Sequence, residues 1–230
     1  MILRAIRAAS LSGETFGVIA PFWAFCYNPA METIAIEQLA DRLLELCAER
    51  GRALLALDGR CASGKTTAAR RLRECLAERK LRDGRRPQTV VLHLDDFFLR
   101  PEQRTEARLR LPGENVDHER FLTEALRPLA SGAAFSFRPY DCRTQTLKEP
   151  VTVPAADIGI IEGAYSCHRD LRGYYDLRVW ADIDPETQRQ RILGRNGEAG
   201  LQRFAELWIP LEERYFRTLG AEVFAYKLLC

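Results

Sequence analysis

Eight residues, Gly59-Arg-Cys-Ala-Ser-Gly-Lys-Thr66, constrain this chain more than any other segment, because they match the pattern GxxxxGK[ST] in full. An apolar run at 53–57 precedes them, and a segment with helical patterning at 65–80 follows. The two glycines permit tight turns, so that consecutive N–H groups can converge on an anion at the N-terminus of the next helix. The sequence therefore predicts a phosphate-binding turn between a buried strand and a helix.

We expect this turn to bind ATP. In loops of this kind the backbone amides hold the phosphates, the lysine reaches the outer phosphates and the hydroxyl that follows it ligates Mg²⁺. Lys65 and Thr66 occupy those two positions. The residues predicted to contact the nucleotide are Gly59, Arg60, Cys61, Ala62, Ser63, Gly64, Lys65, Thr66 and Thr67.

Short apolar runs alternate with helical patterns along most of the chain. The runs lie at 53–57, 89–94, 157–161, 177–183 and 222–229, and the helical patterns at 32–50, 65–80, 119–129, 185–193 and 199–219. Two further segments differ from this alternation, since 99–117 reads as a long loop and 132–153 as a short hairpin. The alternation predicts an α/β fold with a mostly parallel sheet flanked by helices.

Length and charge limit the class of protein. With 230 residues, the chain can form one domain or two small ones, and we expect a single domain at 31–230 after a poorly ordered extension at 1–30. The net charge of +2 argues against a dedicated nucleic-acid partner. No apolar run reaches the roughly 18 residues of a membrane span, so we also expect no membrane partner. A secretory signal is disfavoured because Pro21 interrupts the apolar patch at 18–27.

The cysteines favour a reducing compartment. There are seven, an odd number, and no CxxC pair occurs. The adjacent Cys167 and His168 lack partners at the spacing of a zinc site. We therefore expect neither a disulfide framework nor a zinc site, and a cytoplasmic location.

Acidic residues follow the predicted strands. Asp58 precedes the phosphate-binding turn, Asp95 and Asp96 close the second run, and Glu162 closes the third. Ligands of open α/β sheets bind beyond the carboxyl ends of the strands, where phosphoryl transfer needs a carboxylate for the hydroxyl proton and oxygen ligands for Mg²⁺. We predict that Asp95 and Glu162 share these roles, whereas Asp58 and Asp96 fit helix capping equally well. His93, inside the second run, is expected to be a core residue.

Two observations narrow the class of enzyme. A GTPase normally carries an NKxD motif to read its base, and the chain has none. Helicases and transporter ATPases are usually longer chains with additional machinery. The size therefore favours a kinase that acts on a small molecule.

Five further segments carry a family resemblance: HLDDFF (93–98), NVDHERF (115–121), RPYDCRT (138–144), IIEGAY (160–165) and DPETQRQRILGRN (184–196). Together with DGRCASGKTT (58–67), and in this order, they resemble the uridine kinase-like P-loop kinases, a group that includes phosphoribulokinase and bacterial pantothenate kinase. The resemblance covers about residues 50–196. It implies a P-loop NTPase fold with a small lid, and the use of ATP and Mg²⁺.

The resemblance also assigns roles to individual residues. It implies that Asp95 is the catalytic base, that Glu162 is associated with the metal, and that Asp117 holds a ribose. Tyr140 matches an aromatic residue of the base pocket, and Arg191 and Arg195 match lid arginines that reach the phosphates. The predicted catalytic residues are Asp95, Lys65, Arg191 and Arg195; the predicted substrate-binding residues are Asp95, Phe98, Asp117, Tyr140, Gln145 and Arg191; the predicted metal ligands are Thr66, Glu162 and Asp95.

Two positions depart from the nucleoside kinases. Gln145 stands where those kinases have a histidine that helps to read the pyrimidine, and residues 196–200 lack a lid arginine. We expect transfer of the ATP γ-phosphoryl group to a hydroxyl of a small nucleoside-like acceptor of the uridine or cytidine type. The alternatives are a nucleotide-binding regulatory protein, a simple ATPase, or a kinase for pantothenate or a sugar phosphate. By analogy with related kinases, a homo-oligomer is expected.

Overall fold

The computed structural model describes residues 31–229, so the expected extension at 1–30 lies outside the described residues. The helices are α2 (Ile36–Arg50), α3 (Lys65–Ala77), α4 (Glu106–Leu109), α5 (His118–Phe121), α6 (Arg127–Ser131), α7 (Pro185–Arg203) and α8 (Ile209–Leu219). The strands are β1 (Ala53–Gly59), β2 (Thr89–His93), β3 (Phe135–Phe137), β4 (Tyr140–Asp141), β5 (Thr146–Leu147), β6 (Val151–Val153), β7 (Ile158–Glu162), β8 (Leu177–Asp182) and β9 (Tyr226–Leu229).

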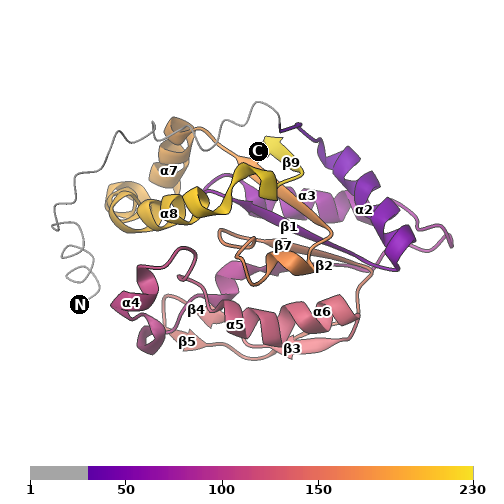
Figure 1. Cartoon of the computed structure of the whole chain (residues 1–230), viewed down its shortest axis with the longest axis horizontal. Helices are drawn as coiled ribbons and strands as arrows, with labels where there is room; N and C mark the ends of the chain where they lie inside the picture. Colours follow the sequence, from indigo (N-terminus) through magenta and orange to yellow (C-terminus); the bar gives the residue numbers. More distant parts are fainter. Residues whose placement is uncertain (1–30, 230) are drawn as a thin grey trace.

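A five-stranded parallel sheet forms the centre of the molecule, with the strand order β2-β7-β1-β8-β9 (Figure 1). β1 lies in the middle, with Leu55 opposite Ile160 of β7 and Leu177 of β8. All residues of β1 and β7 are buried, because both faces of the sheet are covered. A strand buried on both faces reads as a continuous apolar run, which is why the sequence marks these strands clearly.

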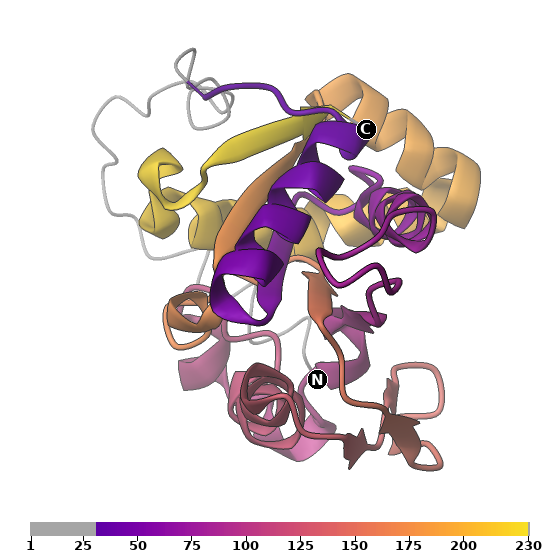
Figure 2. The same cartoon turned by 90° about the vertical axis from the view of Figure 1, so that its right-hand side faces the viewer.

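Helices cover the two faces of the sheet and form two separate cores. On one face, α2 and α3 pack Leu43 and Leu72 against alternate residues of β1 such as Leu55. On the other face, α8 and the helical segment at 118–131 pack aromatic side chains, including Phe121 and Phe216, against the remaining residues of the sheet. Figure 2 shows α2 crossing in front of the sheet and the 118–131 segment below it. The predicted α/β class is confirmed.

The expected hairpin at 132–153 consists of two short antiparallel ladders. β3 pairs with β6, and inside that pair β4 pairs with β5. Gln145 sits in the turn between β4 and β5 with a left-handed φ of 59°. The hairpin lies beside α5 and α6, away from the helices α2 and α3 (Figure 1).

The structure corrects the expected end of one helix and the expected loop at 99–117. The helix expected to end at 193 continues as α7 to Arg203, with a non-helical residue at Gly197, and a π-helical turn at Phe204–Trp208 joins it to α8. The loop expected at 99–117 contains the short helix α4. Within residues 31–229, no helix has both the length and the apolar character needed to cross a membrane.

Candidate active site

The predicted phosphate-binding turn, residues 59–67, joins β1 to α3. Gly59, Ala62 and Gly64 have positive φ angles of 146°, 59° and 97°, so left-handed residues alternate with others along the loop. Such alternation builds a concavity of backbone amides that suits an anion. A Cβ atom at Gly59 would lie 2.4 Å from the carbonyl oxygen of Ala181 on β8, so only glycine fits there.

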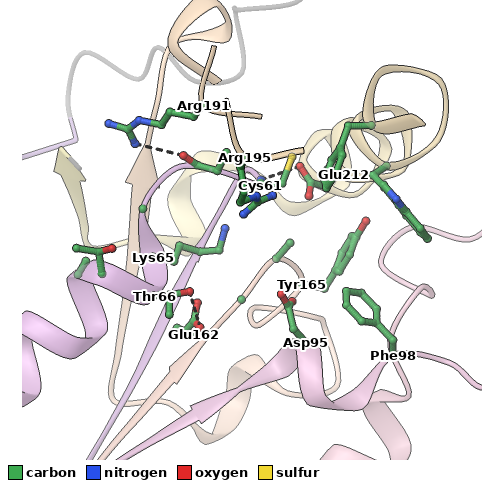
Figure 3. Close-up of a pocket in the computed structure, with 18 of the residues that line it drawn as sticks. Cys61, Lys65, Thr66, Asp95, Phe98, Glu162, Tyr165, Arg191, Arg195 and Glu212 are labelled. Atoms are coloured by element: carbon green, nitrogen blue, oxygen red, sulfur yellow. Dashed lines mark hydrogen bonds between the residues drawn. The ribbon is translucent and has the colours of Figure 1, made fainter. Parts of the chain in front are cut away.

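Lys65 and Thr66 begin α3 and face different partners. Lys65 Nζ donates to the carbonyl oxygens of Gly59 and Arg60 at 2.8 and 2.7 Å, which holds the ammonium group against the loop. Thr66 Oγ1 donates to Glu162 Oε1 at 3.0 Å. Glu162 ends β7, so the structure brings together two of the three predicted metal ligands (Figure 3).

Asp95 lies in the single helical turn Leu94–Phe97 that follows β2. Its side chain is exposed and opens into the same cavity as Glu162. Desolvation by the surrounding protein, followed by the nearby charge of Glu162, raises the pKa of Asp95 above its ordinary value. A carboxylate with a raised pKa is a better proton acceptor near neutral pH, which suits the predicted role of base.

His93 is not a core residue, contrary to expectation. Its side chain is 43% exposed, and Nδ1 lies 2.5 Å from Glu162 Oε1. The reason is the register, because His93 ends β2 directly opposite Glu162 on β7, and paired residues share one face of a sheet. The hydrogen bond to Glu162 raises the pKa of His93.

Lys65, Thr66, Asp95 and Glu162 all line one cavity of about 940 Å³. Its wall is built by the phosphate-binding turn and α3 and by the segments that follow β2 and β7, together with α7 and α8. Figure 3 shows Lys65 between the acids Asp95 and Glu162 on one side and Arg191 and Arg195 on the other. The predicted residues that line it are Cys61, Ala62, Gly64, Lys65, Thr66, Thr67, Asp95, Phe98, Gln145, Glu162, Arg191 and Arg195.

Gly59, Arg60 and Ser63 do not line the cavity. Arg60, predicted to contact the nucleotide, is only 1% exposed, and its guanidinium forms an ion pair with Glu213 on α8 at 2.6 Å. Its side chain therefore anchors the loop to α8 and does not face a nucleotide. Burial of an arginine is tolerated here because a carboxylate of equally low exposure compensates its charge.

Asp117 and Tyr140 are also absent from the cavity wall. The carboxylate of Asp117 accepts the N–H of Arg120 at 3.1 Å and the side-chain amide of Gln103 at 2.7 Å, so it caps α5 and fixes the preceding loop. Tyr140 is 3% exposed, and the guanidinium of Arg104 lies 6.0 Å from its ring centre. Asp117 and Tyr140 thus contact residues next to the cavity and do not line it themselves. Their neighbours Arg104 and Asn115 do line it.

Helix α7 attaches the predicted lid arginines to the loop. Arg191 Nη1 donates to the carbonyl oxygen of Ala62 at 3.2 Å, and Gln188 Nε2 donates to that of Cys61 at 3.1 Å. Arg195 lies over the ring of Phe204, with its guanidinium carbon 5.7 Å from the ring centre. The structure therefore places cationic groups at the cavity edge next to the phosphate-binding turn.

Glu212 on α8 is a site residue that the sequence analysis missed. Its carboxylate accepts the backbone N–H of Cys61 at 3.0 Å, and burial raises its pKa to about 7 against the opposing effects of Lys65 and that N–H group. Its spacing to Tyr215, Phe216 and Leu219 places it on the buried face of the helix, and this acid on an apolar face was the available signal. Burial likewise raises the pKa of the Cys61 thiol, which favours its protonated form.

The donor atoms of the site fit a magnesium ion. Mg²⁺ prefers oxygen ligands, commonly one or two carboxylates together with substrate phosphates. The hydroxyl of Thr66 and the carboxylates of Glu162 and Asp95 are oxygen donors in one cavity, beside a turn built for phosphates. The predicted ligands are therefore of the right chemical type.

Comparison with known proteins agrees with this geometry. The model of the phosphoribulokinase/uridine kinase family matches residues 54–199, a segment that contains the turn, both acids and the lid arginines. The chain belongs to this family. This membership confirms the resemblance seen in the sequence motifs, and the family is one of kinases.

Individual relatives are distant. Uridine-cytidine kinase 2-B of Danio rerio is 29% identical over 168 residues, which are 69% of this chain and 63% of that relative. The structure of a possible uridine kinase from Bacillus stearothermophilus has a TM-score of 0.59 at 24% identity, covering 84% of this chain and 99% of that one. A candidate fructose transport system kinase from Silicibacter sp. TM1040 has a TM-score of 0.65 at 22% identity, covering 85% and 98%. At these identities the structural neighbours establish the fold of the chain and nothing about its substrate.

Proposed function

We propose that the chain is an ATP-dependent kinase that transfers the γ-phosphoryl group to a hydroxyl of a small nucleoside-like acceptor. The observation that carries this proposal is the opening of the Asp95 carboxylate into the cavity that also contains Lys65 and Thr66. A base for an acceptor hydroxyl and a cradle for a polyphosphate are thereby available to the same reaction.

In this proposal the polyphosphate of ATP lies on the amides of residues 59–67, with Lys65 beside its outer phosphates. The acceptor hydroxyl gives its proton to Asp95, and its oxygen forms a bond to the γ-phosphorus. The bond from that phosphorus to the β–γ bridging oxygen breaks, and ADP leaves. Arg191 and Arg195 stabilise the charge on the transferring group, and their helix contacts the loop already.

Thr66, Glu162 and Asp95 would hold a magnesium ion, which supplies charge neutralisation to the phosphates when it is bound. Two neighbours hold Glu162 by its Oε1 atom, which lies 3.0 Å from Thr66 Oγ1 and 2.5 Å from His93 Nδ1. His93 therefore acts as a positioning residue, because it orients the carboxylate.

The acceptor side of the cavity supports a polar ring compound. Phe98 and Trp208 line it with ring centres 6.5 Å apart, and Asn115 and Gln145 line the same cavity. Aromatic surfaces suit a base or sugar ring, and amides can donate to and accept from its polar groups. Family membership supports the same class.

Arg104 favours a second candidate, a kinase for an acceptor with a phosphate or carboxylate group. Arg104 lines the cavity, and its Nε donates to the carbonyl oxygen of Leu99 at 2.8 Å. A guanidinium held in this way over Tyr140 suits an anionic group of the acceptor.

The test combines an acceptor panel with Asp95→Asn. ATP consumption would be measured with nucleosides, pantothenate and sugar phosphates, and we expect consumption that depends on a nucleoside. Asp95→Asn should lower the rate by about 100-fold to 10,000-fold, because the proton acceptor is lost. Asp96→Asn is the matched control, since Asp96 is the neighbouring acid but does not line the cavity.

Each other outcome of the acceptor panel would assign a different function to the protein. Consumption with only anionic acceptors would support the second candidate. Consumption without any acceptor would indicate an ATPase, and nucleotide binding without consumption would indicate a regulatory protein. Near-normal transfer by Asp95→Asn would remove Asp95 from the role of base.

A further inference from the structure

Two of the three histidines of the chain meet outside the nucleotide cavity. His118 begins α5 and His168 lies in the loop after β7, and their rings stack with centres 4.0 Å apart at an angle of 29°. Glu114 lies next to both rings, with one carboxylate oxygen 3.6 Å from His118 Nδ1 and the other 3.6 Å from His168 Nε2. One nitrogen or oxygen of each of these three residues lies within 4.8 Å of the others.

The cluster is buried, and one of its nitrogen atoms lacks a partner. The side chains of His118, His168 and Glu114 are 6%, 2% and 9% exposed. His118 Nδ1 forms no hydrogen bond with any residue in the described part of the chain. A buried polar atom without a partner is costly, which calls for an explanation by a bound group or a proton.

The groups around His118 indicate what kind of partner its Nδ1 atom needs. Its other ring nitrogen, Nε2, lies 3.2 Å from Asp170 Oδ2, and this carboxylate favours a proton on Nε2. In the neutral ring Nδ1 then carries a lone pair, and this lone pair faces Glu114 Oε2 at 3.6 Å and Glu119 Oε2 at 3.5 Å. The guanidinium of Arg108 compensates the two carboxylates. No residue in the described part of the chain donates a hydrogen bond to His118 Nδ1, so this nitrogen is left free to ligate.

The distances favour a metal ion over a proton. A separation of 3.5–3.6 Å is too long for a hydrogen bond. Ligand atoms at the usual zinc bond lengths in a tetrahedron are about 3.4 Å apart, close to the separations observed.

The neighbouring groups support the ligands in the usual way. Arg108 pairs with both Glu114 Oε2, at 3.0 Å, and Glu119 Oε2, at 2.5 Å, and so orients both carboxylates. Asp170 orients the ring of His118, an arrangement common among histidines bound to metals. Gly113 has a φ of 80°, and a Cβ atom there would lie 2.8 Å from the His168 ring, so glycine makes room for the ring.

We propose that Glu114, His118 and His168 bind a divalent transition-metal ion, with zinc the best match to two imidazoles and a carboxylate. The site joins the loop that carries Asn115 to the loop that carries Tyr165, and both of these residues line the nucleotide cavity. The ion therefore has a structural role in fixing one side of that cavity.

The test is a titration of the untagged full chain with Zn²⁺ in excess Mg²⁺, which occupies oxygen-rich sites. We expect one ion per chain. His168→Gln and Glu114→Gln should each weaken binding by more than about 100-fold, because loss of a ligand costs more than loss of a supporting group. His93→Gln is the matched control, since it replaces the third histidine and should keep the affinity.

A second measurement needs no variant. In ¹⁵N spectra of the wild-type side chains, Zn²⁺ should shift the ring nitrogens of His118 and His168 and leave those of His93 in place. Absence of one-to-one binding, unchanged affinity in both ligand variants, or shifts at His93 alone would each overturn the proposal.

Discussion

Glu212 is a buried acid whose charged form is unfavourable in the folded protein. It is 4% exposed on the inner face of α8, and burial outweighs the favourable effects of Lys65 and the Cys61 N–H group on its charge. The folded protein therefore holds its proton more tightly than the unfolded chain does. This difference makes the stability of the protein depend on pH.

We expect Glu212→Gln to stabilise the protein above neutral pH. Below about pH 4.5 the carboxyl group is protonated in both states, so its titration adds nothing to stability. As the pH rises towards 7, the folded-state pKa, the unfolded chain ionises first and the wild type loses stability. Urea unfolding at pH 4 and pH 8 should show the advantage of the glutamine variant growing by an amount on the order of 3 kcal/mol.

Glu206→Gln is the control for this measurement. Glu206 is an exposed acid just before α8, and its replacement should leave the pH dependence as in the wild type. An advantage of Glu212→Gln that is the same at both pH values would show that the carboxyl group does not titrate between them.

The sequence predicted that four residues would meet in one cavity, and short-range geometry explains why they do. Lys65 and Thr66 follow from the turn, and Asp95 and Glu162 follow from strand ends that meet at one edge of a parallel sheet. The side toward which Asp117 and Tyr140 face depends on how the loop at 99–117 folds over the sheet. No local pattern records that packing, so their placement behind the cavity wall could not be foreseen.

At the scale of elements, two prolines explain the irregular helices. π-Helical turns lie at Leu122–Leu126 and Phe204–Trp208, and each ends two residues before a proline, Pro128 or Pro210. A proline has no N–H to donate to the carbonyl group four residues earlier, and a wider turn accommodates the missing bond. Periodicity located both helices but missed this shift, because it assumes a uniform helix.

Helix α7 contains a second irregularity at Gly197. Its φ of 68° and ψ of −179° lie in a region that only glycine adopts readily, and the residue divides the part of α7 that carries Arg191 and Arg195 from the part that carries Arg203. The helix end predicted near 193 lies beside three glycines, at 194, 197 and 200. Only Gly197 interrupts the helical backbone, and the sequence alone does not distinguish it from Gly194 and Gly200.

We expect opposite effects from alanine at two of these glycines. No atom lies within 4 Å of a Cβ at Gly194 or Gly197, so neither change creates a clash. Gly197→Ala should lower the free energy of unfolding by about 1–3 kcal/mol because of backbone strain. Gly194→Ala, in regular helix, should raise it by about 0.5–1 kcal/mol. Urea unfolding of both variants is the measurement, and equal effects would show that α7 is continuous in solution.

At the scale of the whole molecule, Asp58 ties the parts together beneath the phosphate-binding turn. Its buried carboxylate accepts the N–H groups of Gly59, Tyr165 and Cys167 and the hydroxyl of Tyr215, at 2.7–3.2 Å. β1, the loop after β7 and α8 thus meet at one residue. The loop at 59–67 is also bonded to α7 and α8 through Gln188 and Glu212. A ligand on the loop therefore acts on the stability of the entire fold.

Nucleotide binding should stabilise the fold whether or not transfer is possible. A nonhydrolysable ATP analogue with Mg²⁺ at 100 times its dissociation constant should add about 2.7 kcal/mol to the free energy of unfolding. Asp95→Asn should keep most of this gain, since its proposed partner is the acceptor hydroxyl. Lys65→Met should lose most of it at the same concentration, because Lys65 belongs to the phosphate cradle. Loss of the gain in Asp95→Asn would instead assign Asp95 chiefly to metal and nucleotide binding.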